Sequence, residues 1–486
     1  MAEDTPAALL QQGIALHQAG RLPEAEALYR RVLTQEPQNP EALHLYGVLA
    51  YQAKKPSVAL DFISRAIRLR GDQANYYSNA ALALADLGRT EEAEAACRTA
   101  IQLQPGSLEA LNNLGLVLRA AGKLDEAVAS LQALLRRQPG SVQALNNLGT
   151  TLLQLRRHEE AAAVLDEARR HAGDGPHRHS IAYNQAQTLL ALGRFEAGWR
   201  HYESRPTLIG TRRVFEPPLW DGRPVGTLLL HAEQGLGDTL QFCRFASLAA
   251  PGARIVLEVQ PPLKRLLATL PGVAQVIAQG EALPPHDAHH PLMSLPYLLG
   301  TTLETVPAAI PYLQSDPAAT ETWHRRLAPL GGTLRIGLVW AGAPYRPETP
   351  GLVAMDRRRS LELAQLAPLG EIPGAVFVSL QKGPAGAQVP VGLTLHDFTE
   401  ELADFTDTAA LVSALDLVIS VDTSVVHLAG ALGKPVWVLD RFDSCWRWLT
   451  GRSDSPWYPT LKLFRQPSAG DWASPIAEVR AALAGR

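Results

Sequence analysis

A short turn signal recurs at a constant spacing of 34 residues through the first third of the chain. Each copy is a Leu or Ala, then Gly or a basic residue, then Arg or Lys, with helix-forming residues on both sides. The copies in phase are centred on Gly20, Lys54, Gly88, Gly122 and Arg156. A sixth, centred on Gly193, follows after 37 residues, because a few residues are inserted near positions 173–176. A period of this length indicates stacked supersecondary units rather than one closed core.

Small residues keep the same phase. Five positions after each turn centre stand Ala25, Ala59, Ala93, Ala127, Ala161 and Gly198. Seven positions before it stand Gly13, Gly47, Ala81, Gly115, Gly149 and Ala186. Small side chains at both places let the two helices of a repeat approach closely. Pro37, Pro105 and Pro139 mark the ends of second helices, because proline cannot continue a helix.

This pattern resembles the tetratricopeptide repeat, a helix-turn-helix unit of 34 residues, over about residues 6–205. The resemblance implies a right-handed solenoid with a concave groove. An asparagine recurs at one place in four successive repeats, at Asn79, Asn113, Asn147 and Asn184. One interpretation is local: the amides bond between neighbouring helices or repeats. The other is a peptide-binding ladder that grips an extended backbone, which is similar to the asparagine ladder of the nucleocytoplasmic O-GlcNAc transferases.

The period ends near residue 206, and short apolar runs then alternate with helix-forming stretches. The predicted strands are residues 227–231, 254–259, 273–277, 335–340, 376–380, 417–420 and 436–439. A Pro-rich stretch that includes Pro307, Pro311 and Pro317 separates the first three from the rest. Such alternation predicts parallel sheets, and two series predict two Rossmann-like lobes with ligands at the carboxyl ends of the strands.

Two segments that follow predicted strands carry residues suited to chemistry. Residues 231–240 contain two glycines that permit close approach of a substrate, and Asp238 stands where a helix should begin. By pattern alone, the simpler role for Asp238 is to cap that helix. Residues 422–435 also open a helix, whose N-terminus could hold a phosphate. His427 in this segment, taken alone, is more often a structural histidine.

Together, the two segments resemble the inverting GT-B glycosyltransferases of the lipopolysaccharide heptosyltransferase type, over about residues 220–470. Those enzymes carry a Gly-Asp loop after the first strand and a D-[ST]-G-x-x-H-[LI]-A-A-x-x-G-x-P segment in the second lobe. Further matching stretches are residues 339–342, 356–360, 377–382, 404–408 and 454–459. The whole chain is similar to bacterial proteins that fuse tetratricopeptide repeats to this kind of domain, some of which glycosylate flagellin.

The resemblance implies roles for individual residues. Asp238 would be the base that takes the proton of the acceptor hydroxyl, and Lys382 would neutralise charge on the departing nucleotide. The implied donor-binding residues are Trp340, Gly342, Arg357, Gln381, Lys382, Asp422, Thr423, Ser424 and His427. The implied acceptor loop contains Gln234, Gly235 and Gly237. A nucleotide sugar is the expected co-substrate, and neither a metal nor another cofactor is expected.

Two departures concern the donor. Ser424 stands where the heptosyltransferases have glycine, and residues 440–445 are more polar than in relatives. Trp446, Trp448 and Trp457 could stack on a sugar or pack between lobes. His286, Asp287, His289 and His290 have ligand chemistry, but we expect them in a Pro-rich loop and discount a metal.

Composition narrows the setting. A formal charge of -3 gives no reason to expect nucleic acid, and three dispersed cysteines fit a reducing compartment. The first residues lack the pattern of a signal peptide, and no apolar run is long enough to span a membrane. We therefore expect a cytoplasmic protein.

The predicted architecture is α plus α/β: a tetratricopeptide-repeat solenoid (residues 1–205) followed by a GT-B fold. The latter comprises an N-terminal lobe (206–330), a C-terminal nucleotide-sugar lobe (331–470) and a terminal helix (471–486) that returns to the first lobe. The leading hypothesis is an inverting transferase acting on Ser or Thr of an acceptor protein, with flagellin as one candidate. The alternatives are a repeat scaffold with an inactive transferase domain and a glycan or lipid glycosyltransferase. A repeat surface could also support a homo-oligomer.

Overall fold

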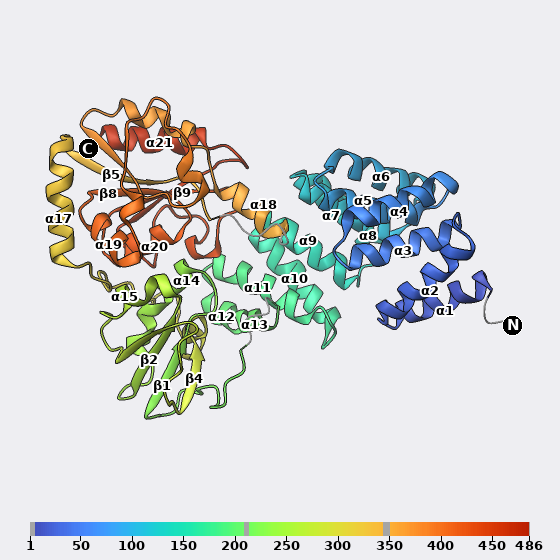
Figure 1. Ribbon diagram of the computed structural model, residues 1–486, viewed down its shortest axis with the longest axis horizontal. Coiled ribbons are helices and arrows are strands. Elements are labelled where there is room, and N and C mark those ends of the chain that lie inside the picture. The colour runs from blue at the N-terminus through green and yellow to red at the C-terminus, as the bar shows by residue number, and fades with distance from the viewer. Residues whose placement is uncertain (1–4, 209–212, 344–349, 486) are drawn as a thin grey trace. The chain divides into compact units, whose positions relative to one another are not determined.

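The computed structural model describes residues 5–208, 213–343 and 350–485. The chain forms two compact units, Met1–Ile181 and Ala182–Arg486. The first unit is built from paired helices, and the second contains two parallel sheets with their helices (Figure 1).

The repeats form antiparallel helix pairs at the predicted period. Their helices are α1 (Pro6–Gln18), α2 (Leu22–Gln35), α3 (Pro40–Gln52), α4 (Pro56–Leu69), α5 (Ala74–Asp86), α6 (Thr90–Leu103), α7 (Leu108–Ala120), α8 (Leu124–Arg137), α9 (Val142–Gln154), α10 (His158–Ala172), α11 (Arg178–Ala191) and α12 (Phe195–Tyr202). The N-terminal region is therefore a helical repeat solenoid.

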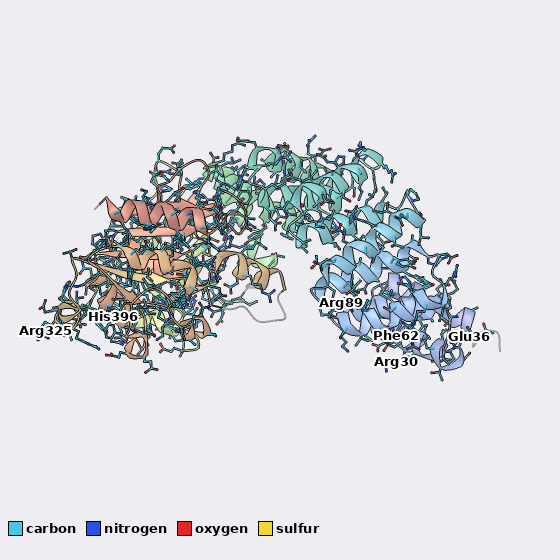
Figure 2. All side chains as sticks on the ribbon, turned by 90° about the horizontal axis from the view of Figure 1, so that it is seen from above. Arg30, Glu36, Phe62, Arg89, Arg325 and His396 are labelled. Atoms are coloured by element: carbon cyan, nitrogen blue, oxygen red, sulfur yellow. The ribbon has the colours of Figure 1, made fainter. Side chains whose placement is uncertain are left out.

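The recurring turn has one backbone requirement. Its central residue has a positive φ in every copy, with glycine in four copies and Lys54 (φ 59°) and Arg156 (φ 61°) in the other two. The basic residue after it often pairs with the following helix, as Arg89 does with Glu92 at 2.7 Å; Figure 2 labels Arg89. All six copies of the turn therefore share a left-handed backbone conformation at the central residue, although this residue is not always glycine.

The phased small residues lie where helices touch. A Cβ added at Gly149 would lie 2.5 Å from Leu165 Cγ, and one at Gly115 would lie 2.7 Å from Leu131 Cγ. In each case, the glycine and the leucine belong to the two helices of one pair. Buried apolar residues of adjacent pairs also pack together, so the small clusters continue from one repeat to the next.

Helix α12 belongs to the second unit. Its Trp199 is buried and packs edge-to-face on Trp446 at 5.4 Å and on Phe242 at 6.1 Å between ring centroids. Arg205, in the short helix α13 (Arg205–Leu208), is also buried and donates to Glu233 Oε1 from Nε at 3.0 Å. The unit boundary at Ile181 thus precedes the predicted boundary at residue 205, which stays a prediction.

The first sheet has the order β3-β2-β1-β4, with all neighbours parallel. Its strands are β1 (Thr227–His231), β2 (Arg254–Val259), β3 (Gln275–Ala278) and β4 (Ala288–Pro291). Strand β1 leads into helix α14 (Leu236–Phe242), and β2 is followed by the short helix α15 (Lys264–Leu267).

The second sheet has the order β10-β9-β8-β5-β6-β7 and is also parallel throughout. Its strands are β5 (Leu334–Val339), β6 (Ala375–Ser379), β7 (Leu395–Asp397), β8 (Leu417–Val421), β9 (Val436–Asp440) and β10 (Leu461–Arg465). Helices α19 (Phe405–Ser413) and α20 (Ser424–Ala431) cover one face, and α21 (Ala473–Ala484) covers the other (Figure 1). Both faces are buried, as is usual for a parallel sheet.

One hydrophobic core joins the two sheets. It includes Leu230 of β1, Val418 of β8, and Leu327 of helix α17 (Pro317–Leu327), which connects the lobes. Arg244 reinforces this junction, because its buried guanidinium donates to the carbonyls of Pro307 at 3.0 Å and Trp457 at 2.7 Å.

Several expectations need correction. His289 and His290 lie in strand β4, which pairs with β1, so the predicted Pro-rich loop is wrong there. The edge strands β7 and β10 were not predicted. Helix α21 packs on the second sheet through Ile476 and neighbouring apolar residues, so the predicted return to the first lobe is wrong.

Candidate functional site

The two predicted motif segments follow strands at the switch point of each sheet, where the chain changes the direction in which it adds strands. In the second sheet, β5 and β8 are neighbours while the chain proceeds outward in opposite directions from them. The carboxyl ends of such strands leave a crevice where α/β proteins bind ligands. Gly342 follows β5 and Asp422 follows β8. In the first sheet, β1 and β4 are the corresponding pair, and Asp238 follows β1.

The motif segments also meet one another. Helices α14 and α20 are in contact, and a Cβ added at Gly237 would lie 2.8 Å from His427 Cδ2 and 3.3 Å from Ser424 Cα. Gly237 is therefore needed for close packing between the lobes, and not only for approach of a substrate. The structure brings together Gly237, Asp238, Ser424 and His427.

Asp238 has partners on both carboxylate oxygens. Oδ2 accepts from the Gly235 N–H at 2.8 Å, which satisfies a backbone donor at the start of α14. Oδ1 accepts from Arg447 Nη2, and the side chain of Asp238 is 20% exposed. The predicted N-cap position is wrong, because Gly235 is the N-cap and Asp238, inside the first turn, bonds back to its N–H. The carboxylate also forms an ion pair with the other lobe.

His427 is buried and makes structural contacts. Its Nδ1 lies 3.0 Å from the Tyr458 hydroxyl, and its ring stacks on Trp448 with centroids 5.5 Å apart. Burial lowers the pKa of His427 well below its ordinary range, and the nearby Arg447 and Arg244 lower it further. The neutral ring therefore supports the junction of the lobes, and contact with a donor would require it to be uncovered.

Gln381 ties two strand ends together. Its Oε1 accepts from the Trp340 N–H at 3.0 Å and the Ala341 N–H at 2.8 Å, and its Nε2 donates to the Ala341 carbonyl at 3.1 Å. The Trp340 ring is buried in the core under the second sheet. These two predicted donor residues thus hold together the chain segments that follow β5 and β6.

Charged side chains lie in the segments near the carboxyl ends of β5 and β6. The ion pair of Arg359 with Asp356 lies directly over Gly342, whose N–H donates to Ser360 Oγ at 3.0 Å. Arg357 is exposed on the adjoining helix α18 (Pro350–Arg359). Lys382 is also exposed, and its ammonium group donates to the Leu402 carbonyl.

A second group of charged residues lies at the end of β9 and in the residues directly after it. Asp443 accepts from Arg358 Nε at 2.9 Å and pairs with Arg441 at 3.1 Å. Asp440 is fully buried, pairs with Arg465 at 2.6 Å and has no hydrogen-bond partner on Oδ1 among the described residues. Burial raises the pKa of Asp440 to about 6, although Arg465 opposes the shift.

The remaining predicted donor residues lie at the start of α20. Thr423 precedes the helix, with its hydroxyl 3.1 Å from Ser420 Oγ, and Ser424 begins it. Gln234 of the acceptor loop has a carbonyl that accepts from Gln260 Nε2 at 2.7 Å. The aromatic residues Trp446, Trp448 and Trp457 are all buried, so they pack the lobe junction.

The repeated asparagines form hydrogen bonds between neighbouring repeats. The bonded side-chain pairs, each 35 residues apart, are Asn79–His44 at 3.0 Å, Asn113–Ser78 at 2.9 Å and Asn147–Asn112 at 2.9 Å. Asn184 occupies the equivalent place on α11. The local interpretation is therefore realised, and peptide recognition by the same amides stays a prediction.

Two cavities lie away from the motif residues. A groove of about 660 Å³ between residues 363–371 and α21 is lined by Ile476, Ala477 and their neighbours. A smaller hollow of about 370 Å³ borders Phe195 and Leu303. Within the described parts of the chain, no group of three or more His, Cys, Asp or Glu residues is arranged to hold a metal ion. Nor does any helix described there have the length and apolar character needed to cross a membrane.

The arginines that bind the acidic residues of the site were not predicted from the sequence. Arg447 binds the carboxylate of Asp238, and Arg465 binds that of Asp440. A signal existed, because Arg447 stands between two tryptophans in a stretch that matched no apolar pattern. Its partner lies 209 residues away, which no local pattern reveals.

Comparisons with known proteins separate the two halves of the chain. The family model described as "Tetratricopeptide repeat" matches residues 78–142, 112–176 and 146–203. A second model, described as "Anaphase-promoting complex, cyclosome, subunit 3", matches residues 18–100. Among solved structures, the chain is similar to MamA (23% identity, TM-score 0.30, 35% of this chain and 93% of that one). It is also similar to pilF of Pseudomonas aeruginosa (19% identity, TM-score 0.37, 43% of this chain and 93% of that one).

A relative matches across both halves. The protein FlbA of Caulobacter vibrioides is 29% identical over an alignment of 502 positions. This alignment covers 97% of this chain and 83% of FlbA. The N-terminal region is thus an array of tetratricopeptide repeats, followed by two parallel sheets, in a chain that is similar to FlbA.

Proposed function

We propose that the second unit has a GT-B fold and is an inverting, metal-independent glycosyltransferase. It would move a sugar from a nucleotide sugar to a Ser or Thr of an acceptor protein. The observation that carries this proposal is the meeting of the two motif segments, at Gly237 and His427, beside the switch points of two parallel sheets. Ligands bind at such switch points in α/β proteins.

The proposed chemistry is a single displacement. The acceptor hydroxyl oxygen forms a bond to the anomeric carbon as the bond from that carbon to the diphosphate oxygen breaks. Asp238 takes the hydroxyl proton, since each carboxylate oxygen keeps acceptor capacity beside its present partner. Lys382 and Arg357, which are both exposed, compensate the charge of the departing diphosphate.

The acceptor would be recruited by the repeats. Side-chain amides recur along successive repeats, and such groups can bond an extended backbone without reading its sequence. Tethering a protein through the repeats would raise its effective concentration near the transferase. Flagellin is the first acceptor we would test.

The first experiment is a thermal-shift panel of nucleotides and nucleotide sugars on the wild type and on Lys382→Ala. A ligand at a hundredfold excess over its dissociation constant stabilises the folded state by about 2.7 kcal/mol. We expect one nucleotide class to raise the melting temperature of the wild type and to do so less in the variant. If no nucleotide shifts the wild type, the transferase proposal loses its basis.

A repeat-based scaffold is the second candidate. It is favoured by the burial of His427 and by the structural use of Gln381, which together leave fewer groups ready for a donor. A scaffold would bind partner proteins but consume no nucleotide sugar. A glycan or lipid acceptor is the third, and an acceptor screen separates it from a protein acceptor.

A further inference from the structure

Arg447 is almost completely enclosed. The residue is 9% exposed, and its guanidinium lies 4.4 Å from the centre of the Trp446 ring. Nε donates to Gln241 Oε1 at 2.7 Å, Nη1 donates to Cys445 Sγ at 3.2 Å, and Nη2 donates to Asp238 Oδ1. A planar guanidinium with donors engaged on several sides has one available orientation.

The turn that carries Arg447 is anchored in its own lobe. The short helix at Trp446–Trp448 ends at Leu449, which has a φ of 54°. Arg465 Nη2 donates to the carbonyls of Trp448 at 2.8 Å and Leu449 at 2.9 Å, and Arg465 also pairs with the buried Asp440. The position of Arg447 is therefore set by the second sheet, since Asp440 ends β9 and Arg465 ends β10.

Asp238 receives one constraint from each lobe. The Gly235 N–H holds Oδ2 from within the first lobe, and Arg447 holds Oδ1 from the second. Two bonds on different oxygens restrict rotation of the carboxylate. A base must point at the proton that it removes, and a misplacement of about 1 Å can cost about a hundredfold in rate.

We infer that Arg447 is a positioning residue for Asp238, which orients the carboxylate toward the acceptor hydroxyl only while the two lobes are joined. This inference rests on the proposed transferase function. It assigns to the connection between β9 and β10, which carries Arg447, a role in orienting the proposed base. Arg447 itself touches no reacting atom.

The kinetic test compares Arg447→Gln and Arg447→Lys with the control Arg452→Gln. Arg452 lies in the same connection but pairs with the exposed Asp454. We expect Arg447→Gln to lower kcat about 10- to 100-fold with KM for the donor changed less than about threefold. Arg447→Lys should recover part of the loss, and Arg452→Gln should behave as the wild type.

Chemical rescue adds a readout that a general loss of structure would not give. Added guanidinium should partly restore the rate of Arg447→Ala, because it can refill the space beside the Asp238 carboxylate. An unchanged kcat in Arg447→Gln would overturn the inference while leaving the proposed function intact.

A crystal structure of Arg447→Gln tests the inference without any activity. We expect the Asp238 carboxylate to rotate away from its present orientation, with α14 otherwise in place. A carboxylate that keeps both its rotamer and its bond to Gly235 would refute positioning by Arg447. By contrast, failure of the wild type to consume any nucleotide sugar would contradict the proposed function. The crystal structure of Arg447→Gln would still show whether Arg447 orients the Asp238 carboxylate.

Discussion

The two units of the chain use opposite strategies to hold their parts together. In the repeats, one kind of contact recurs: Gly47 against Ile63, Gly115 against Leu131, and Gly149 against Leu165. In the second unit, the joining contacts occur once each, such as Trp199 on Trp446, Arg244 on Trp457 and Arg447 on Asp238. Loss of a repeated contact should therefore act locally, because stability in a repeat array is a sum over neighbours. Loss of a unique contact should affect the whole second unit.

The largest expected effect is on the transfer rate when the proposed base, Asp238, is replaced. Asp238→Asn should lower the transfer rate by about 10²- to 10⁴-fold, because a positioned general base contributes that much. Stability should also fall, because the buried guanidinium of Arg447 loses its charged partner, although an amide oxygen can still accept from the Gly235 N–H. Steady-state nucleotide release measures the rate. The exposed Asp454→Asn is the control, and equal rates for Asp238→Asn and the wild type would remove Asp238 as the base.

The next effect concerns the aromatic junction. Trp199→Ala should lower the free energy of unfolding of the second unit by about 3–5 kcal/mol, because a fully buried aromatic ring is lost. The matched change in the repeats is Tyr29→Ala, which removes a ring that is also fully buried. Hydrogen exchange should show loss of protection throughout the second unit for Trp199→Ala, but only near α1–α4 for Tyr29→Ala. Loss of protection that extends equally far in both variants would contradict the proposed difference between the two units.

Acidification should destabilise the second unit by a smaller amount. Burial lowers the pKa of His231 to about 3 and of His290 to about 4, with nearby charged groups adding to both shifts. The folded state thus keeps both rings neutral, while the unfolded chain binds protons below about pH 6.5. The free energy of unfolding therefore decreases as the pH is lowered through that range. Asp440 acts oppositely, because its raised pKa of about 6 makes folding bind a proton between about pH 3.8 and 6.

Together, His231, His290 and Asp440 give a net loss of roughly 2 kcal/mol between pH 7 and pH 5, and His427, whose pKa burial also lowers, adds to this loss. Urea unfolding at both pH values measures it. His290→Leu should flatten the dependence, because it removes a buried ring that binds a proton only in the unfolded chain. A steeper slope in His290→Leu would contradict the assignment.

The smallest effect on stability belongs to the repeated amides. The Asn113→Ala/Asn147→Ala double variant should cost about 1 kcal/mol for each lost inter-repeat bond. Binding to an acceptor protein should nevertheless fall if the amides also grip its backbone, which affinity measurement on the full chain would detect. Unchanged binding and transfer would leave the amides with their structural role alone.

Much of the fold could be predicted because its signals are local. The turn spacing and phased small residues revealed the helix pairs, since a left-handed turn and a close helix contact each place a requirement on a single position. The central strands β1, β5 and β8 were found because strands buried on both faces have continuous apolar runs. Strand β4 escaped because its short AHHP sequence resembles a loop, and only pairing with β1 makes it a strand.

The sequence by itself determined the repeat array, the two parallel-sheet series and the motif segments that follow their strands. The tertiary structure alone decided that α12 packs in the second unit, that α21 stays with the second sheet, and that Arg447 holds Asp238. The physical reason is the range of the interactions. Helix and strand periodicity is written within a few residues, whereas the partners of a buried charge or ring are chosen by how distant elements pack.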